Sequence, residues 1–140
     1  MNGDKVFVDT NVLVYAYDLD AGRKHQLALE IMKDLWRSGC GLLSTQTIQE
    51  FFVTITKKIS ASVDVSFARE TIKRLSKWDI VIINVDTIIE ATELQERYNY
   101  SFWDSLVVAA ALAGGAKTIL SEDLSDKQII KEITIKNPFR

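Results

Sequence analysis

Four acidic residues of the 140-residue sequence, Asp9, Glu50, Asp104 and Asp123, stand in or beside apolar runs, where their carboxylates could meet in the folded chain. Several carboxylates at close range repel one another and raise each other's pKa unless a divalent cation neutralises them. A cation held in this way can activate water and stabilise charge on a phosphate, which is the chemistry of phosphodiester hydrolysis. The acidic residues therefore predict a metal-dependent hydrolase of phosphodiester bonds.

The scarcity of histidine and cysteine restricts the choice of metal. His25 and Cys40 are the only residues of their types in the chain, whereas zinc sites are built from several Cys and His ligands. Carboxylate oxygens suit Mg²⁺ or Mn²⁺, so we expect one of these ions as the cofactor. A single histidine also argues against a Ser-His-Asp hydrolase, and a single cysteine excludes a disulfide within the chain.

Two of the acids also have a purely structural interpretation, because they stand where a helix begins. Asp9 followed by Thr10 is typical of a strand end and a helix cap, and Ser101, three residues before Asp104, resembles part of a capping box. A carboxylate in the first turn of a helix gains only about 0.3 to 1 kcal/mol. Residues 102–113 are apolar on almost every face, so we expect a helix buried all round, in which an unpaired carboxylate costs several kcal/mol.

The other two acids are harder to assign from the sequence. Glu50 lies roughly opposite the apolar stripe of its helix, so a solvated face is the simpler interpretation. Asp123 shares the segment 121–126 with Glu122 and Asp126, and a solvated acidic loop would also explain this segment. Sequence spacing does not choose among these three acids.

The apolar pattern places the acids on an alternation of strands and helices. Runs of β-forming or continuously apolar residues predict strands at residues 5–8, 41–44, 80–85, 117–121 and 132–135. Helical spacing and capping residues predict helices at residues 12–17, 23–37, 45–59, 64–78, 86–98 and 102–113, with Asp86 as the cap of the fifth.

This order of elements predicts an α/β fold. We expect a single domain over residues 1–140, with a parallel central sheet of about five strands flanked by helices. Parallel strands end at one edge of the sheet, and the crossover helices begin near that edge. The four acids follow strand ends or lie early in helices, so this edge is where they would meet.

The composition is that of an ordinary globular domain. Hydrophobic residues make up 47% of the chain, and the formal net charge is −2, so nucleic-acid binding would need a local patch or a metal. Arg69, Lys73 and Lys77 share a helix face that could hold RNA phosphates, although a solvated face is the simpler interpretation. No targeting or membrane-spanning segment is visible, and we expect a cytoplasmic protein with no membrane partner. The tryptophans follow helical stripes and are expected as core or dimer contacts rather than base-stacking platforms: Trp36, Trp78 and Trp103.

Four segments carry a resemblance to a known family. They are Val8-Asp9-Thr10-Asn11-Val12-Leu13, Glu50-Phe51, Phe102-Trp103-Asp104-Ser105-Leu106 and Leu120-Ser121-Glu122-Asp123-Leu124. In these segments the chain resembles the PIN-domain ribonucleases, in particular the VapC-type toxins of bacterial and archaeal toxin–antitoxin pairs. The resemblance runs from Lys5 to about Phe139, and the order of the Asp-Thr-Asn and Ser-Glu-Asp tripeptides makes it specific.

The resemblance implies a Mg²⁺- or Mn²⁺-dependent endoribonuclease, usually a homodimer, that cleaves RNA and is held inactive by a cognate antitoxin. By position it assigns the catalytic acids to Asp9, Glu50, Asp104 and Asp123, with Asp9, Asp104 and Asp123 as metal ligands. The supporting hydroxyl and amide groups would be those of Thr10, Asn11 and Ser121, where the family often has Thr at the last position. Asp126 is a candidate additional acid.

Two other functions also fit the sequence. A Mg²⁺-dependent phosphohydrolase of the haloacid-dehalogenase kind would use Asp9 as its nucleophile, but that chemistry needs an acid two residues later, where this chain has Asn11. A non-catalytic interaction module would use the carboxylates only to cap helices. Capture of a phosphorylated Asp9 would support the first alternative, and a lack of metal affinity would support the second.

Overall fold

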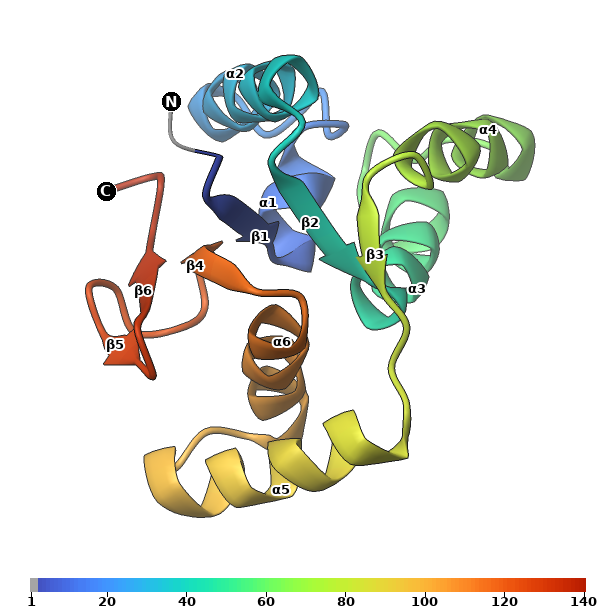
Figure 1. Cartoon of the computed structure of the whole chain (residues 1–140). Helices are drawn as coiled ribbons and strands as arrows, with labels where there is room; N and C mark the ends of the chain where they lie inside the picture. Colours follow the sequence, from blue (N-terminus) through green and yellow to red (C-terminus); the bar gives the residue numbers. More distant parts are fainter. Residues whose placement is uncertain (1–2) are drawn as a thin grey trace.

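The strands form one mostly parallel sheet. The computed structural model describes residues 3–140, in which six strands are arranged in the order β3-β2-β1-β4-β6-β5 (Figure 1). Their bounds are β1 Lys5–Val8, β2 Gly41–Ser44, β3 Asp79–Val81, β4 Ala116–Leu120, β5 Ile129–Ile130 and β6 Ile133–Lys136. Only the β5–β6 pair is antiparallel. The predicted α/β fold with about five parallel strands is confirmed, and the two-residue β5 is an addition at the edge.

Helices cover both faces of this sheet (Figure 1). Their bounds are α1 Thr10–Tyr15, α2 Arg23–Ser38, α3 Thr45–Val53, α4 Val65–Leu75, α5 Val85–Tyr98 and α6 Phe102–Ala113, with a π-helical turn, η1 Thr54–Lys58, continuing α3. Within residues 3–140 no helix is long and apolar enough to cross a membrane.

Alternation along the strands divides the core between the two faces. Phe7 and Leu42 pack with α5 and α6 on one side, whereas their neighbours Val8 and Leu43 pack with α1 to α4 on the other. Successive residues of a strand point to opposite faces, so continuously apolar strands are what a sheet covered on both faces requires.

The strand predicted at residues 80–85 is too long. β3 ends at Val81, and Asn84 caps α5 by accepting a hydrogen bond from the Thr87 amide at 3.0 Å. Ile82 and Val85 are 73% and 69% exposed, so their apolar character does not reflect burial in a strand. Because the Asn84 side chain satisfies the first turn, α5 begins earlier than predicted, and Asp86 lies in that turn instead of capping it.

The register of β1 against β4 sets the position of the chain ends that follow them. Val8 pairs with Leu120, and the Asp9 amide donates to the Leu120 carbonyl at 2.9 Å. The segments that follow β1 and β4 therefore leave the sheet side by side, beginning at Asp9 and Ser121. α6 begins near this edge and runs away from it toward the start of β4, so Trp103 and Asp104 in its first turn border the same cavity as Asp9.

Gly41 illustrates how tightly the sheet is packed against the helices. A Cβ at this position would lie 2.4 Å from the ring of Trp78, which is itself packed edge to face on Trp36 with centroids 5.5 Å apart. We expect Gly41→Ala to lower the free energy of unfolding by about 1–3 kcal/mol, because the ring has to move. Urea denaturation measures this change.

The exposed Lys117 of β4, which is separated from β2 by β1, provides the control for this prediction. Lys117→Ala should shift the urea midpoint little, because the side chain packs against nothing in the core. A Gly41→Ala variant as stable as the parent protein would show that the Trp78 ring is free to shift.

Candidate active site

The four predicted acids line one cavity. Asp9, Glu50, Asp104 and Asp123 all border a cavity of about 660 Å³ at the sheet edge where β1 and β4 end. They come from four different segments of the chain, and their charges act on one another. The repulsion from Asp123 and Glu50 raises the pKa of both other acids, in each case after the larger effect of burial.

Asp9 is the buried acid at the bottom of this group. It is only 5% exposed, and its carboxylate accepts hydrogen bonds from the Thr10 amide at 2.7 Å and from the Ser121 hydroxyl at 2.8 Å. Burial raises the pKa of Asp9 to about 6, although these two hydrogen bonds act to lower it. Asp9 also caps α1, so the structural and the functional interpretation of this residue are compatible.

Ser121 and Asn11 connect Asp9 to the segment that carries Asp123. The Ser121 hydroxyl, which donates to Asp9, accepts from the amides of Asp123 and Leu124 at 3.1 and 3.2 Å. Asn11 donates its amide to the Asp123 carboxylate at 3.0 Å and accepts from the Glu122 amide at 3.1 Å. A neutral hydroxyl and a neutral amide thus orient two carboxylates without neutralising them.

Glu50 faces the cavity although it lies on the more polar side of α3. The Thr10 hydroxyl donates to its Oε1 at 2.7 Å, and the amide of Gln46 lies 3.4 Å from its Oε2. Glu50 is exposed to solvent, as the helical spacing predicts, but it is exposed within the cavity. Gln46, which sequence reasoning missed, stands four residues before Glu50 and so on the same helix face.

Asp104 lies in the first turn of α6, which Ser101 caps by accepting from the Asp104 amide at 3.1 Å. Burial raises the pKa of this carboxyl group. The prediction that the whole helix is buried is wrong for this turn. The fully buried run begins at Ser105, whereas Asp104 is half-buried and Trp103 is 63% exposed, because the turn projects into the cavity.

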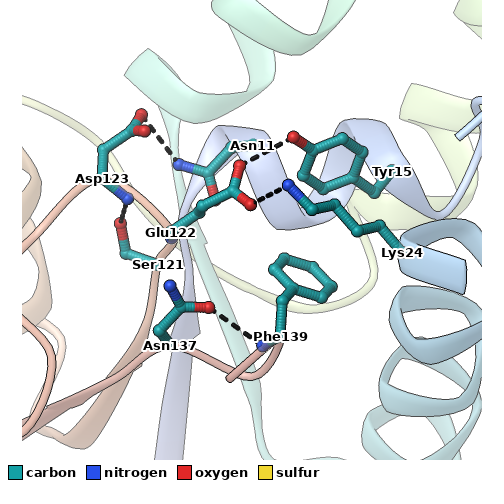
Figure 2. Close-up of polar contacts among 8 residues, drawn as sticks. All are labelled: Asn11, Tyr15, Lys24, Ser121, Glu122, Asp123, Asn137 and Phe139. Carbon is teal, nitrogen blue, oxygen red and sulfur yellow. Dashed lines mark hydrogen bonds and ion pairs between the residues drawn. The ribbon is translucent and has the colours of Figure 1, made fainter.

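The structure separates the three acids of the 121–126 segment. Asp123 faces Asn11 at the cavity, whereas Glu122 turns away and accepts from the hydroxyl of Tyr15 at 2.7 Å and from the ammonium group of Lys24 (Figure 2). Burial acts to raise the pKa of Glu122, but these two donors hold it below its usual value. Asp126 accepts from the Asn137 amide at 2.8 Å and does not border the cavity.

The groups that line the cavity suit a hard divalent cation better than a soft one. Among residues 3–140, no His or Cys borders the cavity, and Lys58 is the one basic residue that does. In the same part of the chain, no three or more His, Cys, Asp or Glu side chains are placed so that together they could hold a metal ion. Mg²⁺ fits such a site, because it keeps several waters and binds through one or two carboxylates together with substrate phosphates.

Comparisons with known proteins give a family and a fold. A family model described as PIN domain matches residues 6–129, whereas no curated protein sequence matches the chain. VapC20 of Mycobacterium tuberculosis, a sarcin-ricin loop cleaving toxin, has a similar crystal structure, with a TM-score of 0.66 and 21% identity over 85% of this chain and 92% of that chain.

Two further solved structures are also similar. A toxin–antitoxin complex from Klebsiella pneumoniae gives a TM-score of 0.69 at 19% identity over 96% of this chain and 98% of that chain. DNA-bound VapBC from Salmonella typhimurium gives 0.64 at 15% identity over 96% and 98%. At these identities the similarity establishes a shared fold.

The raised pKa of Asp9 predicts how the stability of the metal-free protein depends on pH. Above a pKa of about 6 the folded protein must hold an ionised, buried carboxylate, whereas the unfolded chain ionises it from 3.8 upward. Between these values the folded state binds more protons, so stability falls as the pH rises through this window. At pH 7 the cost is up to about 3 kcal/mol.

We therefore expect Asp9→Asn to be more stable than the parent protein at pH 7 in EDTA, with a difference that disappears near pH 4. Urea denaturation across this pH range measures it. Asp34→Asn, an exposed acid on α2, should show no such pH-dependent gain. If Asp9→Asn were less stable than the parent protein at pH 7, ionisation of the buried Asp9 carboxylate would not be what lowers the stability of the parent protein.

The Tyr15–Glu122 hydrogen bond predicts a second, smaller effect. Tyr15→Phe should lower the free energy of unfolding by about 0.5–1.5 kcal/mol, because Glu122 loses one of its two side-chain donors. Urea denaturation at pH 7 measures the change. Tyr98→Phe, at a half-buried tyrosine on α5, is the matched control, and an equal loss in both variants would assign the effect to packing instead of the hydrogen bond.

Proposed function

Because the chain belongs to the PIN-domain family, we propose that it is a divalent-metal-dependent endoribonuclease that hydrolyses RNA phosphodiester bonds. We propose further that it is the toxin of a toxin–antitoxin pair. The proteins with similar structures include a toxin described as cleaving the sarcin-ricin loop and two toxin–antitoxin assemblies, which supports this proposal.

The convergence of the four predicted carboxylates on one cavity, which Asp18 also borders, carries the proposal. Asp9 is almost fully buried there, and its hydrogen-bond donors are the neutral groups of Thr10, Ser121 and Asn11. A buried carboxylate costs several kcal/mol unless a cation or an ion pair compensates it. The arrangement supports a site that is completed by a divalent cation and a phosphate.

The proposed ligands are Asp9, Asp104 and Asp123, directly or through water, with Mg²⁺ or Mn²⁺ as the ion. When bound, such a cation supplies positive charge that stabilises the phosphodiester and makes water more acidic. Lys58 is the basic residue at the cavity, so the protein's own side chains supply little of the charge that a polyanion would need.

The residues around the ligands orient them. Ser121 and the Thr10 amide hold the Asp9 carboxylate from two sides, and Asn11 holds Asp123. Glu50 is exposed to the cavity and is held by the Thr10 hydroxyl, so we assign it as a further ligand or as the base that takes a proton from the attacking water. In this scheme Asp126 serves the fold, because its carboxylate is used by the Asn137 amide.

The geometry at Asp9 disfavours the phosphohydrolase alternative. Both carboxylate oxygens accept hydrogen bonds, Oδ1 from the Thr10 amide and Oδ2 from the Ser121 hydroxyl. Asn11 lies where the general acid of that chemistry would be needed, and its amide is engaged with Asp123.

We also propose an antitoxin and a second copy of the chain as protein partners. Apolar side chains are exposed on α5 at Val85, Ile88 and Ile89, and on α4 at Val65 and Phe67. Apolar surface of this kind is typical of protein–protein contacts. The toxin–antitoxin assemblies among the similar structures support this part of the proposal.

The test is cleavage of a mixed cellular RNA pool by the purified protein with Mg²⁺ or Mn²⁺. We expect defined fragments with either metal, none with EDTA, and at least about a 100-fold lower rate for Asp104→Asn, because losing a ligand removes several kcal/mol of transition-state stabilisation. Fragment yield against time on denaturing gels measures the rate.

Asp86→Asn, an exposed acid in the first turn of α5, is the matched control and should cleave like the parent protein. Metal-independent cleavage, or full activity of Asp104→Asn, would contradict the proposed site. If no RNA is cleaved, calorimetric titration with Mn²⁺ decides between an unidentified substrate and the non-catalytic interaction module, which predicts no metal binding.

A further inference from the structure

A largely exposed tryptophan stands at the mouth of the acidic cavity. Trp103 is 63% exposed, yet it lines the cavity together with Asp104, the next residue of α6. Among the large apolar side chains exposed in residues 3–140, Trp103 and Val53 are the two that border this cavity. An aromatic ring left in water beside a site points to a ligand surface instead of a packing role.

The other two tryptophans do not border the cavity, although Trp36 is also 41% exposed. Trp36 and Trp78 pack edge to face on each other, with ring centroids 5.5 Å apart. Among residues 3–140, Trp103 has one ring contact, with Phe102 on its own helix, at 5.1 Å between centroids and 77° between planes. Of the two predicted roles for the tryptophans, core or dimer contact, the core role is wrong for Trp103, whose ring meets that of Phe102 edge to face.

The backbone that carries the Trp103 ring is firmly held next to the catalytic acids. The Gln46 amide donates to the Trp103 carbonyl at 3.3 Å and lies 3.4 Å from the Glu50 carboxylate. Ser101 caps the same turn through the Asp104 amide. Gln46 thus ties α3 to the start of α6, and the backbone of Trp103 has a defined position relative to Glu50 and Asp104.

The lining of the cavity includes apolar side chains as well as acidic ones. Val53, Ile59 and Trp103 contribute apolar and aromatic surface, and Lys58 adds one positive charge. A phosphate and its cation need only the carboxylates. Apolar surface beside them suits the flat face of a base, since every nucleobase has a π-face that stacks on an aromatic side chain.

We propose that Trp103 is a base-stacking residue, which receives an unpaired nucleobase of the RNA next to the phosphodiester held at the carboxylates, while Lys58 contacts a flanking phosphate. This assignment rests on the proposed nuclease function. Base and phosphate are joined through a single sugar, so a base stacked on Trp103 brings its phosphate toward Asp104. Stacking requires a base that is free of its partner strand.

The first test separates binding from chemistry by steady-state kinetics on a single-stranded RNA of mixed sequence. Trp103→Ala should raise KM roughly tenfold, as expected for the loss of one stacked base, with a much smaller change in kcat. Trp103→Phe keeps an aromatic face and should recover most of the loss. Trp36→Ala, at a tryptophan on α2 that does not border the cavity, is the matched control.

The second test identifies the stacked base by removing it from the RNA. Fluorescence anisotropy in Mg²⁺, with a labelled strand that carries a non-hydrolysable methylene-phosphonate linkage at the cleaved bond, measures binding without cleavage. An abasic nucleotide beside the cleaved bond should weaken binding to the parent protein and should cause no further loss in Trp103→Ala. Additive losses would mean that the missing base and the indole do not meet, and would overturn the assignment.

The outcomes distinguish this inference from the proposed function. Metal-dependent cleavage with an unchanged KM in Trp103→Ala overturns the stacking role and leaves the nuclease proposal standing. A parent protein that neither binds nor cleaves RNA overturns both. A shift of Trp103→Ala from dimer to monomer in sedimentation, with RNA binding unchanged, assigns the residue to a protein contact and also overturns the stacking role.

Discussion

The parallel pairing of β1 with β4 is the constraint on which the candidate site depends. Val8 lies opposite Leu120, so the next residues, Asp9 and Ser121, leave the sheet as neighbours and the hydroxyl reaches the carboxylate at 2.8 Å. The same hydroxyl accepts the Asp123 amide. One strand register therefore positions a buried acid, its hydrogen-bond donor and a second acid. Hydrogen bonds form only between groups that are about 3 Å apart and well aligned, so a different register would separate these groups.

The electrostatics of the site follow from which donors the fold supplies there. Hydroxyl, amide and backbone N–H groups orient Asp9, Glu50 and Asp123 without adding positive charge. The ammonium group of Lys24 is instead paired with Glu122, outside the cavity (Figure 2). Negative charge in the cavity is thus left for a ligand to neutralise, at a cost to the stability of the ligand-free protein, as is common where a site is preorganised.

Most elements of the fold could be predicted because their signals are local. α6 begins and ends as predicted, since Ser101 caps it and glycines follow it. The signal fails where an element depends on a distant partner, or where the capping residue stands inside an apolar run. β5 has two residues and forms through its pairing with β6. Within the apolar run 80–85, Asn84 caps α5, so the strand ends before it. Periodicity detects apolar spacing but not these contacts.

The sequence by itself determined the chemical character of the site. Its acidic residues and its single histidine and cysteine indicate oxygen ligands and a hard cation, and its strand and helix order indicates the edge where they meet. Only the tertiary structure decided which acids face the cavity. Lys24 and Tyr15, remote in sequence, draw Glu122 away, and Asn137 engages Asp126. The orientation of a side chain depends on the partners that folding brings to it, and local spacing does not encode them.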